Sequence, residues 1–228
     1  MRPPQDYEKV RRAIGWFLRN RQFQAARQRI RPIEYLNAGC GPYVDAGLIN
    51  LDYRWVPGVD VVWDLDRPLP FPSARFRGIF SEHCLEHFDE PGLMAVLREF
   101  LRILLPSGRL RIVVPSLEIH ARAYLASIDG ETASGNAARA AGAGLAFNEV
   151  FYAGHDQMKR SHWRNDGHHF IHDRATLAVC LESAGFVDVS MAGFRQGADS
   201  RLLIDQPDRA WESLYMEAVK PAGSSSSR

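Results

Sequence analysis

Short β-strand patterns, each ending in a glycine or a polar residue, constrain the fold of this chain more than any other feature. Runs rich in branched and aromatic residues, bounded by Gly, Pro or charged residues, occur at 33–36, 47–53, 59–65 and 76–83. A helix is predicted over 91–104, where Pro91 marks the start and apolar residues recur three or four positions apart. Strands that alternate with helices are typical of an α/β domain with a mainly parallel sheet.

The second half of the chain continues this alternation. "SGRLRIVVPS" predicts a fifth strand after a Gly turn, and the Ala- and Gly-rich residues 117–147 predict helical pieces. Residues 173–185 predict a helix between an Asp N-cap and a Gly C-cap, and "FVDVSM" and "SLYMEAVK" predict the final strands. The chain then divides into four parts: a basic amphipathic N-terminal helix at 1–31, one α/β domain at 32–220, a His-rich insert within it at 148–172, and a disordered tail at 221–228.

The composition is that of an ordinary globular protein. The 228 residues suffice for one buried core, with 46% hydrophobic and 24% charged residues and a formal net charge of +1. The N-terminus has no signal-peptide core, and no stretch approaches the roughly 20 apolar residues that a membrane span needs. Three cysteines are too few for a disulfide framework and favour a reducing compartment: Cys40, Cys84 and Cys180. We expect a soluble, cytoplasmic protein without a transmembrane segment. Its oligomeric state is not indicated.

Basic residues gather at the N-terminus, where nine Lys and Arg face two acidic residues in the first 32 positions. Residues 6–29 predict an amphipathic helix, with Val10, Ile14, Phe17 and Leu18 on one side. The helix would pack on the domain through this side, contact a membrane surface weakly, or contact nucleic acid. The first alternative is favoured. The remainder of the chain is net acidic and would repel phosphate, so no nucleic-acid partner is expected.

Polar groups end four successive predicted strands. The first strand leads into the glycine turn "NAGCGP", the second and third end at Asp52 and Asp64, and the fourth ends at Glu82-His83. Glycines let a ligand lie directly against the backbone. A carboxylate at the second strand end can accept both ribose hydroxyls of a nucleoside, and one at the third can accept from an adenine amino group. Because ligands of doubly wound sheets bind beyond the carboxyl ends of the strands, these groups predict one pocket.

In order and spacing these motifs resemble those of class I S-adenosylmethionine-dependent methyltransferases. The resemblance spans residues 33–117 and is carried by "LNAGCGP", "INLDY", "DVVWDLDRPLPFP", "FRGIFSEHCLEHF" and "LPSGRLRIVVP". A weaker likeness continues through "HHFIHDRATLAVCLESAGF" and "SLYMEAVKP". It implies that residues 32–220 form a Rossmann-like methyltransferase domain. The implied α/β fold has a mostly parallel seven-stranded sheet, helices on both faces and antiparallel final strands, with S-adenosylmethionine as the methyl donor.

The resemblance also implies the donor-binding residues by motif position: Asn37, Ala38, Gly39, Cys40 and Gly41 along the methionine part, Asp52 and Tyr53 at the ribose, Asp64 and Leu65 at the adenine, and Ser81 and Glu82 at the sulfonium end. Two departures from the family pattern stand out. The neutral Asn37 replaces a common acidic residue, although its amide oxygen can still bond the donor's ammonium group. The distance from Gly41 to Asp52 is too short for a crossover helix, so this connection resembles the compact subgroup that has a loop there.

The stretch "HCLEH" also matches the H-x-x-E-H pattern of inverzincin zinc peptidases, with His83 and His87 as ligands and Glu86 as base. That chemistry requires both histidines on one helical face and a third protein ligand. The segment follows a predicted strand, and the sequence designates no third ligand. The match is therefore interpreted as a coincidence, and no metal ligand is predicted.

Residues 148–172 hold five of the eight histidines, and Lys159, Arg160 and Arg164 lie near them. These histidines would form a metal site, bind an acidic acceptor, supply a general base, or make structural hydrogen bonds. The region corresponds to the acceptor-capping segment of the family, which favours a substrate-facing role for one or two of the five: His155, His162, His168, His169 and His172.

The predicted function is transfer of a methyl group to a small-molecule acceptor, to an oxygen of a sugar or related metabolite. The sugar element rests on a likeness of "WESLYMEAVKP" to methyltransferases of glycan biosynthesis. A hydroxyl acceptor needs a proton acceptor, for which His83 is the first candidate and His169 the second. Tyr43 is placed to contact the sulfonium or the acceptor with its ring face. The alternatives are the zinc peptidase and a donor-binding scaffold without turnover.

Overall fold

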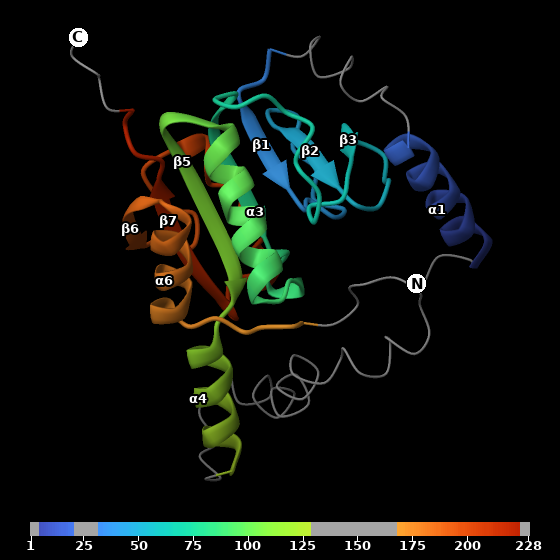
Figure 1. The fold of residues 1–228 in the computed structure, drawn as a ribbon. Coiled ribbons are helices and arrows are strands. Elements are labelled where there is room, and N and C mark those ends of the chain that lie inside the picture. Colours follow the sequence, from blue (N-terminus) through green and yellow to red (C-terminus); the bar gives the residue numbers. More distant parts are fainter. Residues whose placement is uncertain (1–4, 21–31, 129–167, 224–228) are drawn as a thin grey trace, which may run out of the picture.

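The computed structural model describes residues 5–20, 32–128 and 168–223, and a twisted seven-stranded sheet lies at its centre (Figure 1). The strand order is β3-β2-β1-β4-β5-β7-β6. β1 to β5 pair in parallel, whereas β7 is antiparallel to both of its neighbours. This confirms the predicted sheet. The strands are β1 Tyr35–Ala38, β2 Ile49–Asp52, β3 Val61–Val62, β4 Phe76–Glu82, β5 Leu104–Pro115, β6 Val187–Met191 and β7 Ser213–Val219.

Capping interactions mark the ends of two of the helices. In α3, the side chain of Asp89 accepts a hydrogen bond from the Gly92 N–H. In α6, a capping box joins Asp173 to Thr176, and Gly185 ends the helix with a φ of 103°. The described helices are α1 Gln5–Asn20, α3 Glu90–Ile103, α4 Leu117–Ile128 and α6 Arg174–Ala184, with the 3-10 helices η1 Leu85–His87, η2 Ser200–Leu202 and η3 Pro207–Arg209. None of them is long and apolar enough to cross a membrane.

Different elements cover the two faces of the sheet. α3 and α6 pack on one face, where Phe100 and Leu181 join the main apolar cluster of the strands. The segment from Ala192 to Arg209, with η2 and η3, covers the other face among the described residues, and Leu202 packs there against Phe80 and Val113. Both clusters are apolar and buried, so the sheet is stabilised from both sides.

Several predicted boundaries are corrected. The first strand begins at Tyr35 rather than Ile33, and β3 has two residues only. β5 begins directly after α3, at Leu104, and its regular pairing with β4 resumes at Arg109 after an irregularity at the predicted Gly turn. The predicted helical residues 129–147, most of the 148–172 insert and residues 224–228 lie outside the described residues.

The basic N-terminal helix forms as α1, and its predicted continuation over 21–31 lies outside the described residues. Leu18 packs against the apolar cluster of Cys40, Val59 and Val62. Two other members of the predicted apolar side, Val10 and Phe17, are exposed. α1 therefore contacts the domain beside β3 through its C-terminal turn, as Figure 1 shows.

A buried ion-pair network stabilises the loop that covers the second face of the sheet. The Arg111 guanidinium on β5 makes a two-bond contact with Asp205, at 2.8 and 2.6 Å, and donates to Glu217 at 3.2 Å. Its remaining donors bond the carbonyls of Gly193 and Gln196. All five guanidinium N–H groups are thus used, which a buried arginine requires. The network holds the loop that covers this face to the strand beneath it.

Replacing Arg111 should destabilise the fold strongly. The change Arg111→Met leaves the buried Asp205 carboxylate without its cation, and we expect the free energy of unfolding in urea to fall by about 3–5 kcal/mol. Arg109→Met is the matched control on the same strand. Arg109 is partly exposed and lies 3.5 Å from Glu217, so its loss should cost about 1 kcal/mol or less. Equal losses in the two variants would contradict this account of the network.

Candidate functional site

The order of the strands places a topological switch point between β1 and β4. From β1 the chain proceeds outward to β2 and β3 on one side, and later to β4 and β5 on the other. All of these strands are parallel, so their carboxyl ends meet at one edge of the sheet. Ligands of doubly wound sheets bind at such an edge. The predicted donor-site residues all lie on or directly after the carboxyl ends of β1 to β4.

Gly39, directly after β1, is the point at which the strand ends touch. Its φ is 72°, and its N–H donates to the Leu51 carbonyl of β2 at 2.8 Å. A Cβ at this position would lie 2.2 Å from Cys84 Sγ, after β4, and 4.0 Å from a methyl group of Leu65, after β3. The glycine is therefore required both for the left-handed backbone and for the close approach of the β4 loop.

Asp52, at the end of β2, closes the glycine turn. Its Oδ2 accepts from the Gly41 N–H at 2.8 Å and its Oδ1 from the Arg54 N–H at 2.7 Å. Burial raises the pKa of Asp52, and these two backbone donors oppose that rise. Each carboxylate oxygen has two lone-pair sites, so one on each oxygen is left for a further donor.

A hydrogen-bonded loop replaces the crossover helix between β1 and β2, as the short spacing predicted. The buried Asn50 donates to the carbonyls of Asp45 and Leu48 and accepts from the Asp45 N–H. Asn37 donates its amide N–H groups to the Tyr43 carbonyl at 2.9 Å and to Asn50 Oδ1 at 3.2 Å. The amide nitrogen of Asn37 is thus engaged by the loop, so its oxygen is the atom suited to a ligand's ammonium group.

The end of α1 closes the β2–β3 side of the site. The Arg19 guanidinium lies 4.0 Å from the centre of the Tyr53 ring and donates to the Tyr53 carbonyl. Asp64 is partly exposed, and the adjacent Leu65 is buried. The sequence analysis did not identify Arg19, because one arginine among nine basic N-terminal residues carries no signal of its contact.

On the β4 side the predicted residues face the C-terminal part of the chain. Ser81 and Glu82 are buried, and Glu82 Oε1 accepts from the Gln206 N–H at 3.0 Å. Burial raises the pKa of Glu82. Tyr43, from the glycine loop, donates to Asp208 at 3.2 Å, and the Arg209 guanidinium lies 5.3 Å from its ring. η3 therefore approaches the β1 and β4 loops.

Histidines surround one carboxylate just beyond β4. Glu86 is 1% exposed, and its Oε1 lies 3.8 Å from His83 Nδ1, 3.9 Å from His87 Nε2 and 3.8 Å from His168 Nε2. Burial raises the pKa of Glu86 to about 8 and lowers that of His168 to about 4. Burial, with the charge of Arg209, also lowers the pKa of His83 to about 2. Burial therefore favours the neutral form of His83 and His168.

The zinc-peptidase arrangement is not formed by these residues. His83 follows β4 with a φ of 45° and His87 lies on the single turn of η1, so the two do not share a helical face. Glu86 is buried between the imidazoles instead of facing solvent as a base.

Of the other candidate histidines, His168 joins the cluster and His169 does not. His169 is exposed, and its backbone N–H donates to the Glu86 carbonyl at 2.8 Å. His172 and His120 are buried at the carboxyl end of β5. His155 and His162 lie outside the described residues. His168 could not be singled out by spacing, because four neighbouring histidines share its sequence context.

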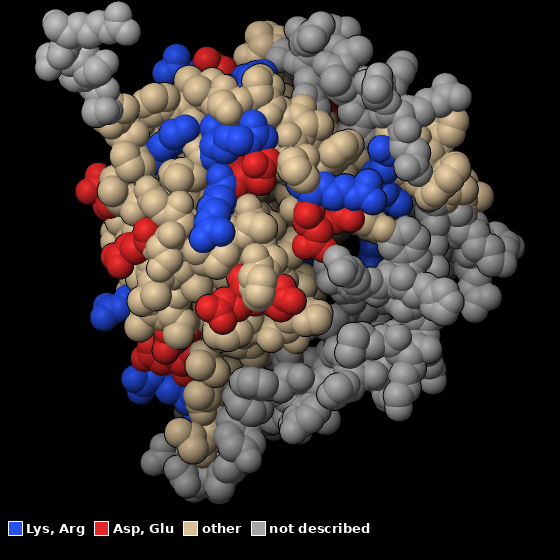
Figure 2. Space-filling model, in the orientation of Figure 1, with Lys and Arg blue, Asp and Glu red and all other residues tan. Residues whose placement is uncertain are grey.

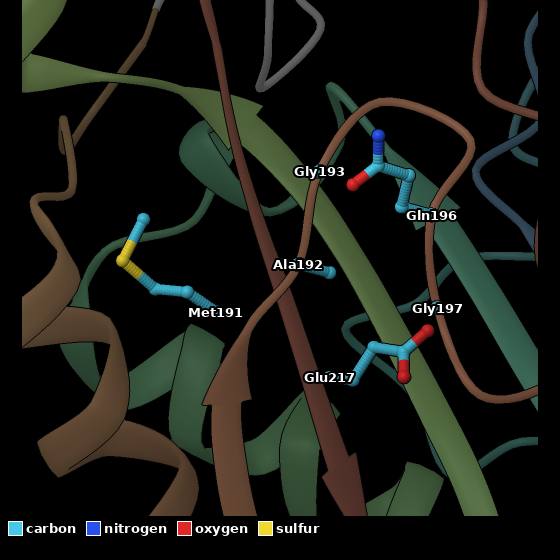
Figure 3. Close-up of a pocket in the computed structure, with 6 residues that line it drawn as sticks. All are labelled: Met191, Ala192, Gly193, Gln196, Gly197 and Glu217. Atoms are coloured by element: carbon cyan, nitrogen blue, oxygen red, sulfur yellow. The ribbon is translucent and has the colours of Figure 1, made fainter.

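A surface hollow also occurs away from the strand ends that form the predicted site. Figure 3 shows it between the end of β6 and β7, lined by Met191, Ala192, Gly193, Gln196, Gly197 and Glu217. The Glu217 carboxylate there is bonded to Arg111 and to the Ala198 N–H. None of the predicted site residues lines it.

A family model described as "Methyltransferase domain" matches residues 8–191. The chain belongs to this methyltransferase-domain family. The match confirms the enzyme class and agrees with the predicted Rossmann-like fold, and S-adenosylmethionine is the methyl donor that the motifs predict for such an enzyme. No curated protein matches the sequence.

The chain is also similar, at low sequence identity, to several solved structures. An Archaeoglobus fulgidus S-adenosylmethionine-dependent methyltransferase is 18% identical, with a TM-score of 0.49, covering 87% of this chain and 93% of that one. The Burkholderia thailandensis 1,6-didemethyltoxoflavin-N1-methyltransferase is 18% identical, with a TM-score of 0.46, covering 97% and 92%. A Bordetella parapertussis protein, described as a possible exported protein, is 16% identical, with a TM-score of 0.47, covering 88% and 66%. Nothing about the acceptor of this methyltransferase follows from these similarities.

Substituting the two glycines of the β1 turn separates steric contact from backbone strain. Gly39→Ala adds a methyl group that overlaps Cys84 and also strains a positive φ. Gly41→Ala adds only the strain, since nothing lies within 4 Å of its Cβ position. We expect Gly41→Ala to lower the free energy of unfolding by about 1–2 kcal/mol and Gly39→Ala by several kcal/mol.

Chemical denaturation of both variants measures these losses. In the double variant Gly39→Ala with Cys84→Ala, part of the loss should be recovered, because the overlapping sulfur is removed. A Gly39→Ala protein as stable as Gly41→Ala would contradict the close contact between the β1 and β4 loops.

Proposed function

We propose that this methyltransferase moves the methyl group of S-adenosylmethionine to an oxygen atom of a small-molecule acceptor, a sugar or a related metabolite. Binding of S-adenosylmethionine is supported by the close approach of four parallel strand ends around Gly39. The acceptor part is supported by the motif likeness of the C-terminal strand and by the polar residues beyond β4.

The residues at the strand ends fit the chemistry of the donor. The Gly39 turn offers backbone without a side chain, against which the methionine part can lie. Asp52 retains one lone-pair site on each oxygen, which matches the two hydroxyls of a ribose. Leu65 supplies an apolar contact and Asp64 an acceptor for the adenine. The Asn37 oxygen is suited to the donor's ammonium group.

Alignment is the main task of the protein in this reaction. When bound, the donor supplies a methyl group already activated by the positive sulfur. The protein contributes by holding an acceptor atom in line with that methyl group and by excluding water. The ends of β4 and β5 border this region, and η1 and the segment from His168 to His172 lie beside them. In Figure 1 that segment passes the carboxyl end of β5 before it enters α6.

A hydroxyl acceptor must also lose its proton. His83 and His169 are the candidates from sequence, and neither is strongly supported by its environment. His83 has a pKa lowered to about 2, which makes it a weak proton acceptor, and its Nε2 is bonded to Ser213. His169 is exposed at the edge of the described residues.

Replacing Asp52 should weaken binding of S-adenosylhomocysteine, the demethylated product of the donor. We expect Asp52→Ala to reduce the affinity by about 1–3 kcal/mol, because two ribose hydroxyls lose their acceptor. Isothermal titration calorimetry measures the change. Asp66→Ala is the control, since it removes the same charge from an exposed position nearby. An Asp52→Ala protein that binds as tightly as the wild type would exclude Asp52 from the site.

Turnover is tested with labelled donor. Incubation of the protein with methyl-labelled S-adenosylmethionine and a metabolite extract should yield a labelled small molecule that resists mild base, as an ether does and an ester does not. Donor binding without any labelled product would favour the scaffold alternative, and label on nitrogen or carbon would contradict the oxygen acceptor.

A further inference from the structure

We propose that Glu86, His87 and His168 bind a divalent transition-metal ion, with zinc as the expected ion. The three residues come from η1 and from the segment that precedes α6, beside the carboxyl ends of β4 and β5. The inference rests on the positions of these side chains and does not require methyl transfer. It also revises the sequence analysis, which found no third ligand for this region.

The distances are close to those of a metal-binding set. One ligand atom from each residue lies within 4.8 Å of the other two. Glu86 Oε1 is 3.9 Å from His87 Nε2 and 3.8 Å from His168 Nε2. Tetrahedral zinc with bonds of about 2.0–2.2 Å separates neighbouring ligand atoms by roughly 3.3–3.6 Å. The three atoms are farther apart than in a zinc-bound set, so binding would draw the side chains inward.

The carboxylate of Glu86 lacks the partner that its burial requires. It is 1% exposed, and neither of its oxygens has a hydrogen-bond partner among the described residues. Buried carboxylates are found paired with a cation, hydrogen-bonded or bound to a metal. Three imidazole nitrogens, atoms of the kind that bind metals, lie 3.8–3.9 Å from its Oε1.

The hydrogen bonds of His83 point to a positive charge at the same place. Ser213 Oγ donates its only proton to the Arg209 carbonyl at 2.7 Å, so it must accept the 2.8 Å bond from His83 Nε2. The Nδ1 of a neutral His83 then has no proton. This lone pair lies 3.8 Å from Glu86 Oε1. Two electron-rich atoms are stable at this separation when a cation or a proton lies near both.

The backbone holds the ligands in place before any ion binds. His169 and Phe170 donate their N–H groups to the Glu86 carbonyl, at 2.8 and 3.2 Å, which attaches the His168 segment to η1. Leu117 donates to the His172 carbonyl at 2.9 Å and attaches the same segment to the start of α4. Ligands from two distant parts of the chain are thus positioned by the fold.

The ligand types select the ion. Two imidazoles and one carboxylate are the protein ligands of many zinc sites that keep an open position, whereas magnesium and calcium prefer oxygen ligands alone. An open position beside the β4 end can take an oxygen atom of a bound molecule. Binding of an acceptor oxygen at this open position rests on the proposed function, whereas binding of the ion does not.

Zinc titration of the full chain, freed of metal beforehand, tests the site. We expect one zinc ion per chain by calorimetry and by elemental analysis after dialysis, and no heat with magnesium or calcium. His168→Gln should weaken zinc binding at least tenfold. His169→Gln is the matched control, since it removes the adjacent exposed imidazole, and its zinc affinity should stay within twofold of the wild type. Circular dichroism must show that both variants are folded.

Cobalt(II) provides a second measurement, because a tetrahedral site with imidazole ligands gives an intense visible absorption. The absorption should appear in the wild type and in His169→Gln and be lost in His168→Gln. Absence of zinc binding to the wild type, or equal affinity in a folded His168→Gln protein, would overturn the proposal. Binding of S-adenosylhomocysteine is measured separately, so failure of the metal site and failure of the donor site are distinguishable.

Discussion

The arrangement of the candidate site depends on the contact between Gly39 and Cys84. Without a side chain at Gly39, the loops that follow β1 and β4 approach to a distance that any Cβ would prevent. The same residue bonds the end of β2 through the Leu51 carbonyl. Four parallel strands bring their ends to one edge of the sheet, and this close approach brings the loops after β1 and β4 into contact there. The Asp52 carboxylate then fixes the turn by accepting the Gly41 N–H.

Contacts from other parts of the chain surround the candidate site at the strand ends. The Arg111 network binds the loop over the second face of the sheet, and Gln206 in that loop donates to Glu82. On the other side, α1 contributes Arg19 above Tyr53. The N-terminal helix, which the sequence analysis expected to pack on the domain, therefore borders the predicted ribose position. Figure 2 shows basic and acidic side chains interspersed over the described part of one face, where no single sign of charge dominates.

The fold could be predicted because its signals are local, whereas the donor residues stay a prediction from motif position. Apolar runs, Pro91, the caps of α6 and the glycine turn each act within a few positions of the residue that shows them. The replacement of a crossover helix by a loop followed from the short connection between Gly41 and Asp52. The contacts of Arg111 and His168 could not be predicted, since their partners lie 94 and roughly 80 positions away in sequence. A charged residue within a strand pattern, or one histidine among five, does not reveal such a partner.

A crystal structure of the protein with S-adenosylhomocysteine is the most direct test of the convergence of the strand ends on one donor. The ribose should lie at Asp52, the adenine beside Asp64 and Leu65, and the amino-acid part along the backbone from Asn37 to Gly39. A structure in which the ligand binds elsewhere, or in which these residues face separate regions of solvent, would contradict the proposed donor site.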